Sequence, residues 1–109
     1  AQQISSLIEQ HAIDAVFAVN ELFAVISVKT AHKLGLKIPE EMSVIAFTDG
    51  IISRYSTPTI TTVSQDGIKM GRRAAKMLIE RIESEDEEEE HYKTEVIETH
   101  LIARETTIS

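Results

Sequence analysis

The sequence predicts an α/β fold, a Rossmann-like parallel sheet flanked by helices, for this chain of 109 residues. Two short apolar runs, 14–19 and 43–47, lack the alternation of apolar and polar residues that marks a half-exposed strand. Each run therefore predicts a strand buried on both faces, as in a parallel sheet. Apolar residues spaced three or four apart surround these runs and predict helices. Buried strands that alternate with helices are typical of layered α/β domains.

The elements follow one another along the chain with short connections. In order, we expect a helix over 2–11, a strand over 14–19, a helix over 21–34, a strand over 43–47, a helical turn over 51–56, a strand over 60–63, a helix over 66–83 and an extended segment over 93–103. Gly35 is placed to end the second helix in a left-handed conformation, and Pro39 prevents its continuation. In the long helix, five residues at spacings of three and four share one face: Ile68, Gly71, Ala75, Leu78 and Ile82.

The charge of the chain is concentrated in one place. Of the net charge of -7, seven acids lie within residues 83–90, and the remainder of the chain carries 11 acids against 11 basic residues. We expect the run over 85–90 to be a solvated turn. No basic patch stands out, so the chain itself is not expected to bind nucleic acid.

The sequence lacks the signatures of an enzyme, a metal site or a membrane protein. It has no P-loop, no glycine-rich dinucleotide fingerprint, no nucleophile elbow and no paired-histidine zinc helix. The four histidines have no ligand spacing, so neither a metal nor a cofactor is expected. The chain has no cysteine, no apolar run long enough to span a bilayer and no signal pattern at its N-terminus, which together indicate a cytoplasmic protein.

Short polar side chains follow each of the three predicted strands. They are Asn20 and Glu21 after the first, Thr48 and Asp49 after the second, and Ser64, Gln65 and Asp66 after the third. Ligands of open parallel sheets bind beyond the carboxyl ends of the strands. Amide and hydroxyl groups suit a neutral, hydroxyl-rich ligand such as a sugar or a nucleoside. The alternative is helix capping, because Asn20, Asp49 and Ser64 each precede a helical segment.

Five blocks of this sequence, in order, resemble the conserved blocks of the lactose-repressor (LacI/GalR) family of transcription regulators. They are DAVFAVNELFAV over 14–25, LGLKIPEEMSVIAF over 34–47, YSTPTITTVSQ over 55–65, MGRRAAKMLI over 70–79 and LIARETT over 101–107. Together they span nearly the whole chain, which makes the resemblance specific although each block alone is weak. Arg104 lies in the closing block, where a structural ion pair is the expectation.

The resemblance implies the type I fold of periplasmic sugar-binding proteins, in which two α/β lobes are joined by three crossovers and hold an effector between them. Residues 1–109 would then form part of an effector-binding domain. Residues 1–64 and 93–109 would belong mainly to its C-terminal lobe, and a helix over 65–84 would cross to an N-terminal lobe missing from this sequence. The family binds DNA through a helix-turn-helix at its N-terminus, which is also absent.

The resemblance assigns roles to individual residues. Asn20 matches a position that contacts the effector, and Gln65 matches one near the effector and the crossover. Thr48 stands where the family commonly has an aspartate, and Asp49 follows it, so both are candidate ligand contacts. The helix after the first strand and the turn after the second help to form the family's homodimer, which singles out Val25, Ile26, Ile51, Ile52 and Tyr55. The alternative for these residues is ordinary core packing.

Three classes of function are compared. The favoured one is a ligand-sensing, dimerising part of a regulator, in which a small effector controls DNA binding allosterically. The second is a sugar-binding receptor of a transport system with the same fold, against which the closing block at 101–107 argues. The third is an enzyme of another α/β family, which the missing catalytic constellation disfavours.

Overall fold

The computed structural model describes residues 2–84 and 93–108. Its elements are α1 (Gln2–His11), β1 (Ala15–Ala18), α2 (Glu21–Lys33), β2 (Ser43–Phe47), α3 (Ile51–Tyr55), β3 (Thr61–Ser64), α4 (Gly67–Glu83) and β4 (His100–Ile102). The chain divides into two compact units, Ala1–Ser64 with Leu101–Ser109 and Gln65–His100. The order of helices and strands is the one that the sequence predicts, and the third strand begins one residue later than expected.

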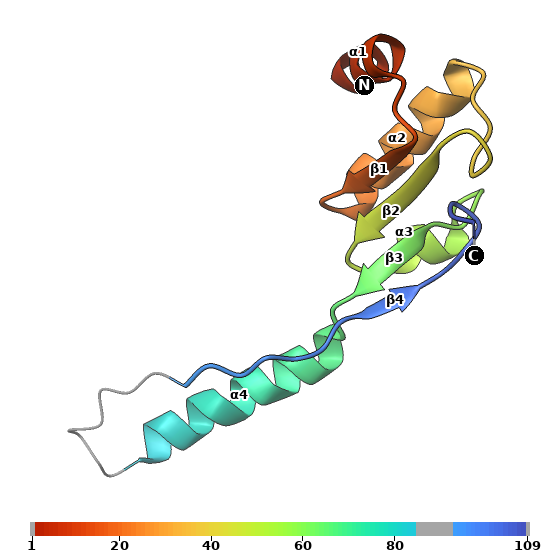
Figure 1. Ribbon diagram of the computed structural model, residues 1–109. Helices are drawn as coiled ribbons and strands as arrows, with labels where there is room; N and C mark the ends of the chain where they lie inside the picture. Colours follow the sequence, from red (N-terminus) through yellow and green to blue (C-terminus); the bar gives the residue numbers. More distant parts are fainter. Residues whose placement is uncertain (1, 85–92, 109) are drawn as a thin grey trace. The chain divides into compact units, whose positions relative to one another are not determined.

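The four strands form one sheet in the order β1-β2-β3-β4 (Figure 1). β1 pairs with β2 and β2 with β3, both in parallel. In this register Ala18 lies opposite Ala46, and Ala46 lies opposite Thr62. The carboxyl ends of the first three strands therefore lie at the same edge of the sheet.

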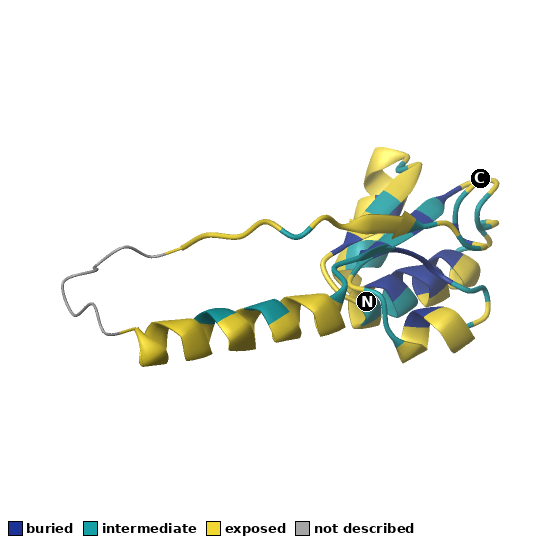
Figure 2. Ribbon diagram, turned by 90° about the horizontal axis from the view of Figure 1, so that it is seen from below, coloured by how far each residue is buried: buried dark blue, intermediate teal, exposed yellow. Residues whose placement is uncertain are grey.

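The core lies between α2 and the first two strands and is built from small and branched apolar residues. Figure 2 shows the buried residues of these elements in dark blue. Its fully or nearly fully buried members are Ile8, Ala18, Ala24, Val28, Ala31, Met42, Val44, Ala46 and Ile60. Ala24 and Ala31 on α2 allow the helix to approach the sheet closely, because a methyl group is their whole side chain.

The expectation that both faces of the strands are buried is wrong for the described residues. The side chains of β1 and β2 alternate between more and less buried, and Phe17 of β1 is 62% exposed. Its ring lies 6.5 Å from that of half-buried Phe47, centroid to centroid. Apolar residues do occur on the second face of the sheet, but no helix among the described residues covers Phe17.

The end of α2 confirms the role predicted for Gly35. Gly35 has a φ of +79°, its N–H donates to the carbonyl of His32, and the N–H of Leu36 donates to the carbonyl of Ala31. These two bonds define a Schellman motif, in which the residue after the C-cap must be left-handed. Glycine is favoured there because it has no Cβ to clash.

The C-terminal segment is hydrogen-bonded to both β2 and β3. Thr106 is fully buried; its hydroxyl donates to the carbonyl of Val44 at 2.6 Å and accepts from the N–H of Thr61 at 2.9 Å. Its backbone carbonyl accepts from the N–H of Val44, and its N–H donates to the carbonyl of Thr59. One threonine thus bonds to residues on both strands and on the segment before β3.

A carboxylate links α2 to α3. Oε2 of Glu21 accepts from the N–H of Ser53 at 2.7 Å and from its hydroxyl at 2.9 Å. Gly50 lies beside this carboxylate, and a Cβ added to Gly50 would overlap Oε1 of Glu21. Gly50 has an extended backbone that any residue adopts, so the space taken by Glu21, and not the backbone, is what favours glycine.

We expect Gly50→Ala to lower the free energy of unfolding by about 1.5–3 kcal/mol, the usual contribution of hydrogen bonds to a charged group. The new methyl group displaces the Glu21 carboxylate from Ser53. The measurement is urea unfolding of a double-mutant cycle with Glu21→Ala. If the same loss persists when Glu21 is already alanine, displacement of the carboxylate is not the cause.

The second unit contains α4, in which no residue is buried. The five residues expected to share one face of this helix are all exposed (Figure 2). Within the unit, Arg73 of α4 forms a bidentate ion pair with Glu95, and its Nε lies 2.7 Å from Oε2. The acidic run over 85–90 lies outside the described residues.

Candidate ligand-binding site

Two predicted site residues lie at the same edge of the sheet. Asn20 lies two residues beyond Ala18, and Thr48 lies two residues beyond Ala46, the partner of Ala18 in the register. Both side chains are exposed. Neighbouring strands are about 4.8 Å apart, so one small ligand beyond these strand ends can reach both residues.

Asn20 caps α2. Its Oδ1 accepts from the N–H of Phe23 at 3.0 Å, and its backbone is extended, as an N-cap requires. The capping alternative is therefore confirmed for Asn20. Capping uses the side-chain oxygen, whereas the amide nitrogen of asparagine carries two further donors that a ligand hydroxyl can accept from. Capping and ligand binding are thus compatible at this residue.

The capping alternative is wrong for Asp49 and Ser64. The N-cap of α3 is Gly50, which makes no side-chain capping bond. The N-cap of α4 is Asp66, whose Oδ1 accepts from the N–H of Lys69 at 3.4 Å. Asp49 and Ser64 each precede the capping position, so capping does not account for either of them.

Thr48 has an unusual backbone. Its φ is +86°, a left-handed value that is rare for a β-branched residue. Its N–H donates to the carbonyl of Val63 at 2.9 Å, which continues the pairing of β2 with β3 by one residue. Such conformations destabilise a protein by about 1–3 kcal/mol, and they persist where the surrounding contacts fix them.

The Asp49 carboxylate is held by three side chains. Oδ1 accepts from the hydroxyl of Thr62 at 2.8 Å and lies 2.8 Å from a guanidinium nitrogen of Arg104. Oδ2 lies 3.0 Å from a nitrogen of Arg54. The side chain of Asp49 is only 5% exposed, and that of Arg104 is 15% exposed. The structural ion pair expected for Arg104 is confirmed, and its partner is Asp49.

This environment sets the charge of Asp49. Burial alone raises the pKa of the carboxyl group, but the hydrogen bonds from Thr62, Arg104 and Arg54 outweigh that effect and hold the pKa below its ordinary value of 3.8. Asp49 is therefore a carboxylate at neutral pH. Sequence analysis did not identify Thr62 as a partner of Asp49. Threonine is common in strands, so a threonine in β3 does not by itself indicate a hydrogen bond to a distant carboxylate.

Gln65, the fourth candidate, is the first residue of the second unit and directly follows the end of β3. Its side chain is half-buried. Contact between Gln65 and a ligand stays a prediction.

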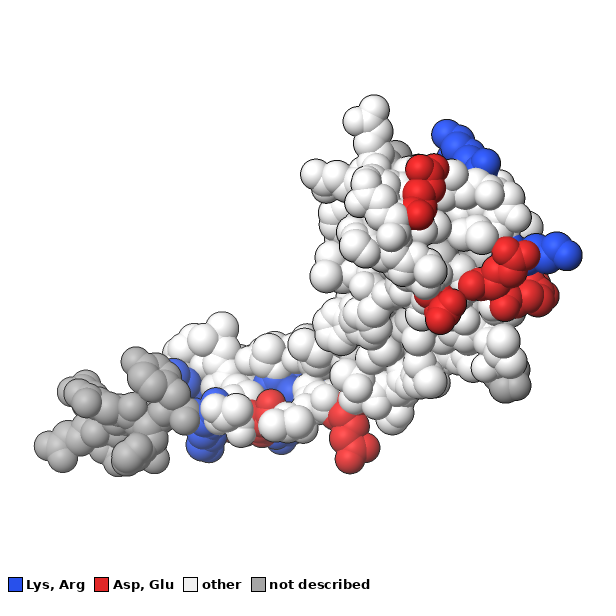
Figure 3. Space-filling view, turned by 45° about the horizontal axis from the view of Figure 1, so that its top comes forward, with Lys and Arg blue, Asp and Glu red and all other residues white. Residues whose placement is uncertain are grey.

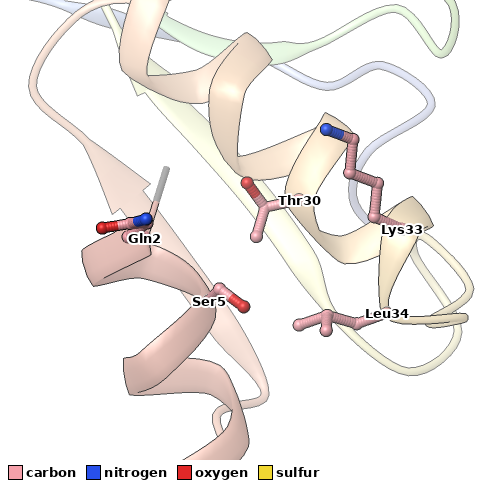
Figure 4. Close-up of a pocket in the computed structure, with 5 residues that line it drawn as sticks. All are labelled: Gln2, Ser5, Thr30, Lys33 and Leu34. Atoms are coloured by element: carbon pink, nitrogen blue, oxygen red, sulfur yellow. The ribbon is translucent and has the colours of Figure 1, made fainter.

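A cavity of about 190 Å³ lies elsewhere, between α1 and the C-terminal part of α2 (Figure 4). It is lined by Gln2, Ser5, Thr30, Lys33 and Leu34. None of the four candidate ligand-binding residues lines it. Over the described residues, no group of three side chains of the types that bind metals lies together, and no helix is long and apolar enough to cross a membrane.

The residues expected at a dimer interface fall into two groups. On α3, Ile51, Ile52 and Tyr55 are 73%, 48% and 81% exposed. On α2, Val25 and Ile26 are half-buried, and Val25 packs against the core. The three side chains on α3 therefore form an exposed apolar surface that no other described residue buries. Val25, in contrast, already packs against the core.

Charged side chains do not dominate the face of the molecule shown in Figure 3. Acidic and basic side chains occur there in small groups that adjoin one another in places, and most of the described surface in that view is uncharged.

Open parallel sheets with polar side chains beyond the carboxyl ends of neighbouring strands form a class of ligand-binding α/β domains. Comparison with known proteins narrows the class. The family model of the periplasmic binding protein-like domain matches residues 1–107. The HTH-type transcriptional repressor PurR of Haemophilus influenzae is 33% identical over 103 residues, which cover 94% of this chain and 31% of the repressor.

Solved structures of similar proteins lead to the same family. The complex of the transcriptional regulator CelR with cellobiose superimposes with a TM-score of 0.80 at 30% identity, over 94% of this chain and 31% of that one. A LacI-family regulator from Enterococcus faecium with bound ribose gives a TM-score of 0.80 at 27% identity, over 96% of this chain and 38% of that one. The chain belongs to the periplasmic binding protein-like family, in the form that LacI/GalR regulators carry as their effector-binding domain. It spans about a third of the length of these relatives.

Proposed function

We propose that this chain is the ligand-sensing, dimerising part of a LacI-type transcription regulator whose effector is a small metabolite, most simply a sugar. The observation that carries the proposal is the placement of Asn20 and Thr48 at one edge of the parallel sheet. The relatives support it, since two of their structures contain cellobiose and ribose. The same relatives are transcription regulators.

The proposal includes an arrangement of lobes. Residues 1–64 and 93–109 belong mainly to the C-terminal lobe, and the helix over 65–84 crosses to an N-terminal lobe. The exposed apolar face of α4 supports this arrangement, because a lobe packed on it would bury those residues. Effector binding between the lobes and DNA binding by a helix-turn-helix would be coupled reciprocally, by about 1–3 kcal/mol. Such a regulator acts in the cytoplasm.

Effector binding is tested on the full-length protein by thermal unfolding with D-ribose, cellobiose and adenosine. A ligand that binds the folded state raises the melting temperature, and at a hundred times its dissociation constant stabilises it by about 2.7 kcal/mol. A rise with any of these compounds supports a ligand-sensing domain. Unchanged melting with all three contradicts a sugar or nucleoside effector.

We expect Asn20→Asp to weaken effector binding about 10- to 100-fold, which corresponds to about 1–3 kcal/mol for a lost hydrogen bond in a buried complex. Aspartate caps a helix as well as asparagine does, so the bond from Phe23 and the stability of α2 are retained. Asn20→Ala is less informative because it also removes the cap. The measurement is isothermal titration calorimetry, and an unchanged affinity would remove Asn20 from the site.

The proposed homodimer uses the apolar surface of Ile51, Ile52 and Tyr55 on α3, together with Val25 and Ile26 on α2. We expect Ile51→Lys to destabilise the dimer by at least about 2 kcal/mol, roughly 30-fold in its dissociation constant. Analytical ultracentrifugation measures the change. Ile108→Lys is the matched control, because Ile108 is also exposed (76%) but lies in the C-terminal segment. Equal effects of the two variants would exclude α3 as the interface.

A transport receptor with the same fold is the alternative. The closing block at 101–107 and the regulators among the relatives favour the regulator.

A further inference from the structure

Thr48 and Asp49 are consecutive residues with opposite surroundings. Thr48 is exposed at the strand end with a left-handed backbone, and the side chain of Asp49 is 5% exposed. The sequence offered both as ligand contacts. Their different surroundings indicate that the two residues have different roles.

The oxygens of Asp49 are already occupied within the protein. Oδ1 bonds to Thr62 and Arg104, and Oδ2 bonds to Arg54. A ligand hydroxyl that approached this carboxylate would compete with two guanidinium groups, whose bonds to a carboxylate are stronger than those of neutral donors. The carboxylate is therefore poorly suited to accept hydrogen bonds from a sugar.

The partners of Asp49 come from separate parts of the first unit. Thr62 lies on β3, Arg54 on α3, and Arg104 in the C-terminal segment. Arg104 is itself fixed, since its guanidinium donates to the carbonyl of Ile60 at 2.8 Å and to the hydroxyl of Thr62 at 3.2 Å. Asp49 is thus anchored to a strand, a helix and the C-terminal segment at once.

This anchoring explains how Thr48 keeps its strained conformation. A β-branched residue at a φ of +86° relaxes toward negative φ unless the residues on either side are held. The ladder bond from Thr48 to Val63 holds one side, and the contacts of Asp49 hold the other. We propose that Asp49, fixed by Arg104 and Thr62, is a positioning residue that presents Thr48 to the effector and does not itself bind it.

The inference rests on the proposed function, because it assigns Thr48 to the effector site. It also narrows the ligand class. With the carboxylate withdrawn into the protein, this strand end offers a hydroxyl and backbone groups, which suit a neutral polyhydroxylated ligand better than a cationic one.

The test uses Asp49→Asn in the full-length protein, with two readouts. The first is the crystal structure of the variant, in which we expect Thr48 to leave the left-handed region. The second is the dissociation constant at 25 °C for whichever of D-ribose, cellobiose and adenosine stabilises the wild type most, which we expect to rise about tenfold. A purely structural role would lower the melting temperature without changing the affinity of the protein that remains folded.

Two further variants keep the test decisive. Thr62→Val removes one bond to Asp49 without removing the charge, and it takes over both readouts if Asp49→Asn does not fold. Glu105→Gln is the control: Glu105 accepts from Thr59 at the opposite end of β3, so it should leave the affinity and Thr48 unchanged.

The outcomes separate the two proposals. If Thr48 keeps its φ in Asp49→Asn, or if the affinity is unchanged in a folded variant, the positioning role is overturned while the effector site stands. If the wild type binds none of the three compounds, the proposed effector class fails, and the backbone of Thr48 in the variant still decides whether Asp49 holds it.

Discussion

Replacing Arg104 with methionine is expected to lower the free energy of unfolding of the domain by about 3–5 kcal/mol. The substitution keeps most of the apolar stem of the side chain but leaves the Asp49 carboxylate, 5% exposed, without its most buried cation. Removing one partner of a buried ion pair is strongly destabilising, because the remaining charge stays desolvated. The change also removes the bond to the carbonyl of Ile60.

Arg54→Met is the matched control for this variant. Arg54 pairs with the same carboxylate at 3.0 Å, but its side chain is 57% exposed. An exposed pair contributes about 1 kcal/mol or less, so Arg54→Met should have a small effect. Urea unfolding of the full-length protein measures both. If the two substitutions lower the free energy of unfolding equally, burial does not explain the stability contribution of the Asp49–Arg104 pair.

The same comparison made at several pH values tests the cause. The pKa of Asp49 is lowered in the folded state, so its contribution to stability is present above the ordinary value of 3.8 and is lost as the pH falls through the folded-state pKa. The stability difference between wild type and Arg104→Met should therefore be largest near neutral pH and shrink as the pH falls below 3.8. A difference that stays constant down to the acid transition would mean that packing, and not charge, accounts for the loss.

The sequence predicts those parts of the fold that depend on local chemistry. The strand over 43–47 and the helix over 2–11 have the predicted bounds, and the helix over 21–34 differs by one residue. Gly35 ends that helix as predicted because a left-handed residue is a local requirement. The third strand begins at Thr61 and not at Ile60, since the N–H of Ile60 donates to the carbonyl of Ser53 instead.

Contacts between distant residues could not be predicted. Thr106 bonds to Val44 and Thr61, which are 62 and 45 residues away in the sequence. Periodicity reports which face of an element is buried and says nothing about which hydroxyl reaches which strand. Burial of Phe17 on the second face was also predicted wrongly, because an apolar run shows that a strand suits burial but not which segments cover it.

The candidate site shows the same division. The position of Asn20 and Thr48 at one edge follows from parallel strands and could be predicted. The φ of Thr48 and the contacts of the Asp49 side chain could not, because Asp49 bonds to Arg104 and Thr62, which are distant in the sequence. Sequence reasoning thus predicts which residues lie at the strand ends more readily than it predicts which of two adjacent polar residues is exposed.

A second large loss of stability is expected for Thr106→Val, about 2–4 kcal/mol. Valine has nearly the shape of threonine, so the packing around this fully buried side chain is kept. The hydroxyl is lost, and with it the acceptor for the N–H of Thr61 and the donor to the carbonyl of Val44. A buried backbone group that loses its partner destabilises the folded state by about 1–3 kcal/mol, and two groups are affected.

Thr106→Ser separates the hydroxyl from the methyl group. Serine keeps both hydrogen bonds and loses one buried methyl group, which corresponds to about 1 kcal/mol. Guanidinium unfolding of the two variants should therefore place serine above valine in stability. The reverse order would show that Thr106 stabilises the junction of β2 and β3 by filling space. The predicted order would show that its hydroxyl joins the two strands near their amino ends, which is the arrangement that holds β2 and β3 in register.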